Sequence, residues 1–304
     1  MSVSQPFGTE AWVVVLEGRD PRQADEAIFV LRAIGIEHAL TRLDRTWQLS
    51  VPAASASRAS TELAAYRAEM QADPRHGRIN IEEIGHGWYG VVAYVCVLLV
   101  AAIASNQDLL GYDWLGTGRL DVDRVMAGEW WRTVTALCLH ADLGHLGGNI
   151  AFGGFFGLFA GRYLGSGIAW LGILMGGLLG NALNALIQPS GHLAIGASTA
   201  VFAALGMLAA YTWRRGFFKQ TSWKTRAAPV TAAIGLLAFV GTGGGGEGGN
   251  VDIIAHLTGF IAGFSVGVLL ALRKPPSDGR IQTYTGTVAA GIIAVAWIWG
   301  SVAS

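Results

Sequence analysis

Residues 163–213 read YLGSGIAWLGILMGGLLGNALNALIQPSGHLAIGASTAVFAALGMLAAYTW and contain no Lys, Arg, Asp or Glu. A helix needs about 20 mostly apolar residues to cross roughly 30 Å of hydrocarbon. This stretch is long enough for two such helices, and the turn-forming residues 188–191 (QPSG) mark the break between them. It therefore predicts two consecutive membrane-spanning helices.

Uncharged stretches recur through the rest of the chain, at residues 84–107, 143–161, 227–246, 253–272 and 281–304. Together with residues 163–213 they predict seven spanning helices. The stretch 227–246 is the weakest, because only residues 230–240 are strongly apolar before a run of glycines begins. The expected fold class is an all-α polytopic membrane helical bundle.

The overall composition agrees with a membrane protein and excludes several other classes. Of the 304 residues, 52% are hydrophobic and 14% are charged, which is about half the charged share of an average soluble domain. The 21 basic and 21 acidic residues cancel, so there is no basic excess to bind nucleic acid. Cys96 and Cys138 are too few for a disulfide framework.

The first 78 residues have a different, soluble composition. They contain no basic segment followed by an apolar core, so no signal peptide is expected. We expect residues 1–78 to be a small cytoplasmic α+β domain with its linker, and residues 79–304 to be the membrane domain. The β-α-β-β-α order behind this expectation comes from strands at 11–16, 37–42 and 47–51 and helices at 24–33 and 56–70.

Basic residues set the expected orientation, because cytoplasmic loops are enriched in Lys and Arg. The loops after the third and fifth predicted helices have none. This pattern predicts an N-terminus in the cytoplasm and a C-terminus outside, and the Ala-, Gly- and Arg-rich composition suggests a bacterial inner membrane. The segments after the fourth and sixth helices carry most of the basic residues: Arg214, Arg215, Lys219, Lys224 and Arg226, then Arg273, Lys274 and Arg280.

Four polar residues occupy helix ends that this topology places near the outer face: His145, Asn149, Ser198 and His256. Polar side chains in hydrocarbon are costly unless they have partners, so these four are functional candidates. A serine, histidines and an amide at one level of a bundle indicate a nucleophilic site. The simpler alternative is that Ser198 bonds a carbonyl of its own helix and that the other three are packing groups.

Small residues at Gly259, Gly263 and Gly267 repeat every four positions on the predicted helix of His256. This spacing lets two helix backbones come close together. We expect the helices of Ser198 and His256 to pack closely, because proton transfer between a serine and an imidazole needs about 2.6–3.2 Å.

Four motifs, in order, resemble those of the rhomboid intramembrane serine proteases. His140-Ala-Asp-Leu-Gly-His145-Leu-Gly-Gly-Asn149 matches the HxxxxHxxxN signature, and Glu129-Trp130-Trp131-Arg132 looks like the WR motif. Gly196-Ala197-Ser198-Thr199 falls where the family carries GxSG, and residues 255–263 (AHLTGFIAG) resemble its AHxxGxxxG motif. The resemblance covers roughly residues 84–272. The extra helix at about 281–303 resembles the six-plus-one arrangement of part of the family.

The resemblance implies a role for each residue. Ser198 would be the nucleophile and His256 its general base, a dyad without a carboxylate, while His145 and Asn149 would stabilise the oxyanion. The implied substrates are membrane proteins, cut in or near their spanning segments within the lipid bilayer. No metal or other cofactor is implied, and the oligomeric state stays open. The residues expected to support the site are His140, Arg132, Gly196, Thr199, Phe202, Gly259 and Gly263.

Two residues depart from the family pattern. Thr199 follows the nucleophile where the family usually has glycine, so we expect its β-branched side chain to narrow the pocket. Phe202 stands where many relatives have Tyr, so a ring is available to stack on the imidazole without a hydroxyl. We expect activity to survive both changes with an altered substrate preference.

Other functions fit parts of this pattern less well. A catalytically inactive rhomboid-like protein that binds transmembrane helices is the main alternative, although both Ser198 and His256 are present. A transporter is disfavoured because its usual repeats, broken helices and intramembrane acids are missing from the sequence. Zinc and aspartyl intramembrane proteases would need H-E-x-x-H or two membrane aspartates, and the sequence has neither.

Access of a substrate helix to Ser198 requires part of the bundle to move. The segment expected to move is the fifth predicted helix with residues 241–249, because it is short, glycine-rich and weakly apolar.

Overall fold

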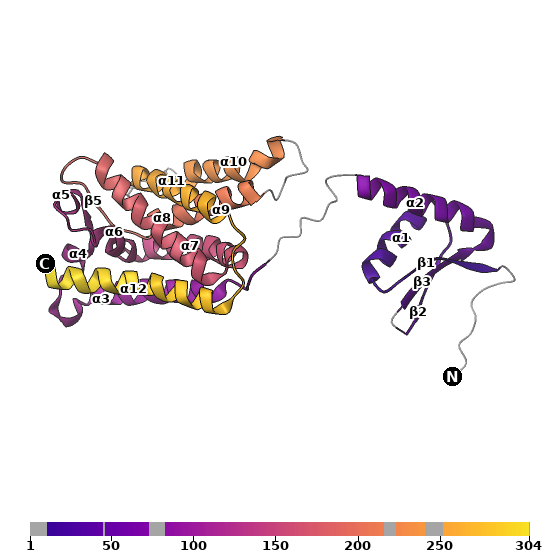
Figure 1. Cartoon of the computed structure of the whole chain (residues 1–304), viewed down its shortest axis with the longest axis horizontal. Coiled ribbons are helices and arrows are strands. Elements are labelled where there is room, and N and C mark those ends of the chain that lie inside the picture. The colour runs from indigo at the N-terminus through magenta and orange to yellow at the C-terminus, as the bar shows by residue number, and fades with distance from the viewer. Residues whose placement is uncertain (1–10, 45, 73–82, 216–222, 241–251, 304) are drawn as a thin grey trace. The chain divides into compact units, whose positions relative to one another are not determined.

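The computed structural model describes residues 11–44, 46–72, 83–215, 223–240 and 252–303. The chain divides into two compact units, Met1–Arg78 and Ile79–Ser304 (Figure 1). Each unit has its own hydrophobic core.

The first unit is a small α+β fold with the predicted β-α-β-β-α order. Its strands form an antiparallel sheet in the order β1-β3-β2. Leu49 and Val51 of the central strand are completely buried in a cluster with Leu31 and Leu63 from the two helices, so both helices cover the same face. The elements are β1 (Trp12–Gly18), α1 (Pro21–Ala33), β2 (Ala39–Leu43), β3 (Thr46–Pro52), a 3-10 turn (Ala53–Ser55) and α2 (Ala56–Ala72).

The described residues of the second unit form seven long helices where the uncharged stretches predict them. They are α3 (Trp88–Asn106), α7 (Leu143–Leu164), α8 (Ser166–Ile187), α9 (Ser198–Arg215), α10 (Trp223–Val240), α11 (Ile253–Leu270) and α12 (Gly279–Ala303). Among the described residues, five of them are long and apolar enough to cross a membrane by themselves: α3, α7, α8, α11 and α12.

Within the described residues, the helices α9 and α10 are not long and apolar enough to meet this criterion. The helix α9 ends in Arg214 and Arg215, and the apolar part of α10 is only Ala227–Ala238. The helix α9 packs against α7, α8, α10 and α11. Because protein rather than lipid surrounds it, α9 does not need a uniformly apolar surface.

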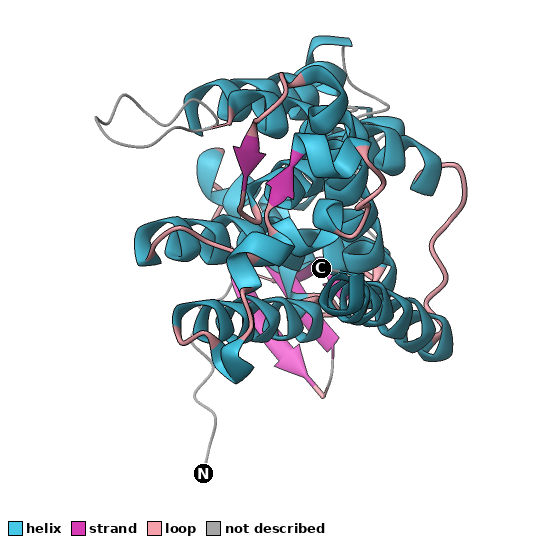
Figure 2. Ribbon diagram, turned by 90° about the vertical axis from the view of Figure 1, so that its left-hand side faces the viewer, coloured by secondary structure: helices cyan, strands magenta, loops and turns pink. Residues whose placement is uncertain are grey.

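The segment between α3 and α7 is folded. Its short strand β4 pairs antiparallel with β5 (Leu193–Ala194), which lies just before α9; both are magenta in Figure 2. The segment contains a 3-10 turn (Leu109–Gly111), α4 (Trp114–Gly118), β4 (Leu120–Asp121), α5 (Val122–Met126), α6 (Arg132–Thr135) and a second 3-10 turn (Ala136–Cys138).

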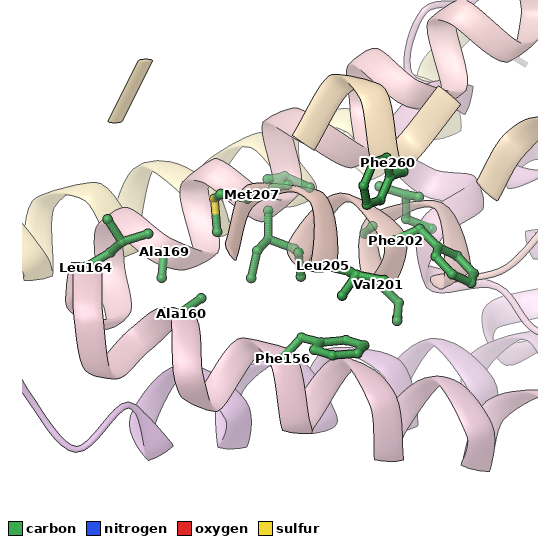
Figure 3. Packing of buried hydrophobic residues seen from close by; sticks show 14 of the residues in the cluster. Phe156, Ala160, Leu164, Ala169, Val201, Phe202, Leu205, Met207 and Phe260 are labelled. Carbon is green, nitrogen blue, oxygen red and sulfur yellow. The ribbon is translucent and has the colours of Figure 1, made fainter. Parts of the chain in front are cut away.

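Apolar side chains from several helices fill the core of the second unit, and Figure 3 labels members from four of them. Phe202 and Met207 belong to α9. The other labelled members are Phe156, Ala160 and Leu164 of α7, Ala169 of α8, Val201 and Leu205 of α9, and Phe260 of α11.

The helices α9 and α11 approach each other through the glycines that the sequence singled out. A Cβ atom on any of Gly259, Gly263 and Gly267 would overlap α9 at less than 3.0 Å. The atoms that it would meet are the carbonyl oxygens of Thr199, Ala203 and Met207, respectively. The expected close packing of the two helices is therefore confirmed, and it is contact between backbones.

The last helix, α12, closes the turn between α7 and α8. The Gln282 side chain accepts hydrogen bonds from the backbone N–H groups of Gly167 at 2.9 Å and Ile168 at 3.2 Å, and it donates one to the Leu164 carbonyl at 3.1 Å. Near the other end of α12, a Cβ on Gly300 would lie 2.9 Å from the Trp131 ring. The helix α12 thus contacts both the hairpin α7–α8 and the folded segment before α7.

We expect the substitution Gly263→Ala to destabilise the second unit by about 1–3 kcal/mol, because its methyl group must displace the backbone of α9. The matched control is Gly291→Ala on α12, where an added Cβ meets nothing within 4 Å. The free energy of unfolding of each variant is measured in mixed detergent micelles. Equal stabilities for the two would contradict this account of the α9–α11 contact.

Candidate active site

A cavity of about 1640 Å³ opens between the helices of the second unit. Its walls include all four polar residues that the sequence places at one level: His145, Asn149, Ser198 and His256. These residues come from α7, α9 and α11, so the fold gathers them from three helices into one space.

Ser198 is the first residue of α9 and follows a backbone that only glycine adopts readily. Gly196 has a φ of +129°. A Cβ on Gly196 would lie 2.7 Å from Cε1 and Nε2 of His145 and 3.7 Å from Oγ of Ser198. The missing side chain therefore gives the His145 ring its place beside the serine. The Gly196 N–H also donates to the Ala136 carbonyl at 2.9 Å, which fixes this turn to the folded segment.

His256 lies in the first turn and a half of α11, with only 7% of its surface exposed. The ring of Phe202 lies against its imidazole, with centroids 4.4 Å apart and planes inclined by 35°. One turn later, Gly259 contacts the Thr199 backbone. The position of the imidazole is thus set by an aromatic ring on α9 and by the close approach of the two helices.

Asn149 presents a hydrogen-bond donor that the described residues leave without a partner. Its side-chain Nδ2 is buried and makes no hydrogen bond, although the residue lines the cavity. The Asn149 backbone is held in place, since the Tyr94 hydroxyl donates to its carbonyl at 2.8 Å. A buried amide left unsatisfied costs about 1–3 kcal/mol, so a held, unused donor is suited to an acceptor that arrives in the cavity.

His140 lies beside His145, with ring centroids 5.1 Å apart. Burial, followed by the charge of His145, lowers the pKa of His140 to about 4. The neutral ring accepts a hydrogen bond at Nε2 from the Ala197 N–H at 3.4 Å, so its own hydrogen is on Nδ1. His140 therefore supports the backbone immediately before Ser198.

Asp142 begins the helix that carries His145 and Asn149. Its carboxylate accepts the His145 N–H at 2.8 Å, and this hydrogen bond lowers the pKa of Asp142.

Arg132 is completely buried in the folded segment before α7. Its Nε donates to the Glu129 carboxylate at 2.6 Å, and its Nη1 donates to the carbonyl oxygens of Gly116 at 2.8 Å and Arg119 at 2.9 Å. One guanidinium thus joins α6, which carries it, to α4 and to the residue between α4 and β4. Arg132 does not line the cavity.

The Thr199 side chain was expected to narrow the pocket, and its methyl group packs between helices. Its Cγ2 methyl lies between α8 and α11, where it is 2.8 Å from a Cβ built on Gly180 and 2.9 Å from one on Gly259. Thr199 is 3% exposed and contributes to the cavity wall as well. The methyl group fills the junction that the two glycines leave open.

Two residues that the sequence did not single out belong to the cavity wall. The side chains of His192 and Asp252 are 2.7 Å apart. Asn184 and Gln188 of α8 also donate to Asp252. The signal in the sequence was the spacing of Asn184 and Gln188, four apart on one helix face, but their partner is more than 60 residues away.

The structure leaves two expectations where they stood. Residues 241–249, expected to move with the fifth predicted helix, lie outside the described residues. Within the described ranges, no group of three or more His, Cys, Asp or Glu side chains is placed to hold a metal ion.

The fold and the cavity define a polytopic membrane protein whose bundle encloses a serine, histidines and an amide. A rhomboid domain is matched by residues 127–273. Over this region the chain is similar to proteins of the rhomboid family.

Three relatives show how far the similarity extends. The rhomboid protease GluP of Bacillus subtilis is 29% identical over 158 residues, which are 51% of this chain and 29% of GluP. The putative rhomboid protease YdcA of the same species is 29% identical over 192 residues, or 61% of this chain and 91% of YdcA. RHOMBOID-like protein 4 of Arabidopsis thaliana is 33% identical over 170 residues, or 56% of this chain and 41% of that protein. The chain thus spans less than half of GluP and of RHOMBOID-like protein 4.

The depressed pKa of His140 predicts a loss of stability in acid. The unfolded chain binds a proton at this imidazole near pH 6.5 and the folded chain only near pH 4, so stability falls as the pH drops through this window. We expect the melting temperature in detergent to fall between pH 7 and pH 5 by about 2–4 °C more in the wild type than in His140→Gln, which keeps an acceptor but does not titrate. Parallel curves for the two proteins would refute this role for His140.

Proposed function

We propose that this protein is an intramembrane serine protease that hydrolyses peptide bonds in or near the transmembrane segments of membrane proteins. Ser198 is the nucleophile and His256 the general base. The observation that supports this most directly is the cavity of about 1640 Å³ inside an apolar bundle, lined by both residues and by the unused amide donor of Asn149. Hydrocarbon excludes water, so hydrolysis in a membrane requires a polar cavity of this kind.

In the proposed reaction, the Ser198 hydroxyl attacks the carbonyl carbon of the scissile bond while its proton passes to the His256 imidazole. Phe202 holds that imidazole in place by ring contact. The resulting oxyanion accepts hydrogen bonds from Nδ2 of Asn149, the ring N–H of His145 and the backbone N–H of Ser198. His256 then protonates the leaving amine as the C–N bond breaks. A water molecule then attacks the acyl-enzyme carbonyl while its proton passes to His256. The bond to Ser198 breaks as His256 returns that proton to the serine oxygen.

The proposed orientation places the open end of the cavity outside the cytoplasm. The first residues of α9 and α11 line the cavity, whereas Arg214, Arg215 and Arg273 lie at the opposite ends of these helices. Cytoplasmic loops carry the excess of basic residues. The first unit is then cytoplasmic, α12 ends outside, and the bacterial inner membrane is the proposed location.

A fluorophosphonate in detergent tests the nucleophile. We expect the wild type to be labelled covalently, and Ser198→Ala and His256→Ala to remain unlabelled while both fold. Ser301, whose side chain is exposed on α12, provides the control. We expect Ser301→Ala to keep full labelling. If the wild type stays unlabelled while a rhomboid protease beside it is labelled, a non-cleaving protein that binds transmembrane helices becomes the better account.

The oxyanion role of Asn149 predicts a large kinetic effect with little effect on folding. We expect Asn149→Ala to lower the turnover of a transmembrane substrate by about 10²–10³-fold, as the loss of one oxyanion donor does in serine proteases. The control Asn106→Ala removes an exposed amide that only bonds its own helix on α3. Turnover by Asn149→Ala within threefold of the control would rule out this role.

A further inference from the structure

The Asp252 carboxylate receives an unusual number of hydrogen bonds for the residue that begins a helix. An N-cap side chain ordinarily accepts one backbone N–H. Asp252 does this for Ala255 at 2.9 Å. It also bonds three side chains: Asn184 at 2.8 Å, Gln188 at 3.0 Å and His192 at 2.7 Å. Burial by itself opposes ionisation, but these hydrogen bonds and the charge of His192 outweigh it and lower the pKa of Asp252.

The three side-chain partners come from two different parts of the fold. Asn184 and Gln188 belong to the C-terminal end of α8, and Asn184 is completely buried. His192 belongs to the segment that leads through β5 to Ser198. Asp252 therefore connects the start of α11 both to a neighbouring helix and to the chain just before the serine.

The backbone around His192 is itself fixed. The His192 carbonyl accepts the Val122 N–H at 3.1 Å, and the Gly191 N–H donates to the Asp123 carboxylate at 3.0 Å. The segment is thus anchored to the folded region before α7. The hydrogen bond from His192 therefore ties Asp252, at the start of α11, to this anchored segment.

Asp252, the N-cap residue of α11, lies one helical turn before His256. The His256 N–H donates to the Asp252 carbonyl at 3.2 Å, in the first turn of the helix. His192 lies six residues before Ser198, and Asp252 lies four residues before His256. The same carboxylate therefore joins the two chain segments that carry the serine and the histidine.

We propose that Asp252, held by His192 and by the end of α8, is a positioning residue that sets the approach of His256 to Ser198. It does not touch the reacting atoms. It fixes where α11 begins relative to the segment that carries the nucleophile, complementing the glycine contacts farther along the two helices. This inference rests on the proposed protease function.

The effect expected from losing this link is on reaction rate rather than on binding. A misplacement of about 1 Å far from the reacting atoms can lower a rate by about 10²-fold. Because His192 lies at the edge of the network, His192→Ala removes one donor and leaves the cap on Ala255 and both α8 contacts in place. His192→Gln replaces the lost donor with an amide N–H.

The experiment measures fluorophosphonate labelling of the full chain in detergent, separated into the maximal rate kinact and the concentration constant KI. We expect His192→Ala to lower kinact at least about tenfold with KI within twofold, and His192→Gln to recover to within about threefold of the wild type. Asp252→Ala should lower kinact further, and the double variant should be no slower than Asp252→Ala alone, since the two residues act as one unit.

Melting temperatures and a second helix cap separate positioning from simple stabilisation. Asp113→Ala removes a cap of the same kind on α4, where Asp113 accepts the Gly116 N–H at 2.7 Å, and should leave kinact unchanged. If His192→Ala labels like the wild type, or if kinact falls only in proportion to melting temperature across all variants, the positioning role is overturned and the protease function stands. An unlabelled wild type would instead overturn the protease function and this inference with it.

Discussion

The structure depends above all on a contact between two helix backbones. Gly259, Gly263 and Gly267 of α11 repeat at the same interval as the α9 carbonyl oxygens that they meet. A side chain at any of these positions would force the helices apart, and with them the ends that carry Ser198 and His256. In a bilayer, where lipid is as apolar as leucine, close packing of this kind takes over much of the role that the hydrophobic effect has in water.

Different contacts position the polar side chains at the cavity and in the folded segment before α7. Around the cavity, a glycine at 196 makes room for His145, the Phe202 ring supports His256, and Asn149 keeps its amide free. Farther out, Arg132 of α6 bonds the carbonyl oxygens of Gly116 in α4 and of Arg119 just after it. Much of the cavity is thus built from residues that leave space or hold backbone in place.

Local patterns predicted much of this arrangement. Uncharged stretches located the seven long helices of the described residues, and the predicted topology placed four polar residues of the cavity wall at one level. Contacts between distant segments were not predictable in the same way. No periodic sequence pattern marks them, because each depends on where a remote segment lies. Examples are the folding of residues 109–138, the pairing of β4 with β5 and the bond between His192 and Asp252.

The bond of Gln282 to the turn between α7 and α8 has a consequence for how the bundle is made. The N–H groups of Gly167 and Ile168 are among the first of α8, which no earlier residue of that helix can satisfy. Their partner belongs to α12 (Gly279–Ala303), more than 110 residues farther along the chain. The turn between α7 and α8 is therefore completed only after residue 282 has been synthesised, and a chain that stops short of it leaves these two N–H groups without the Gln282 acceptor.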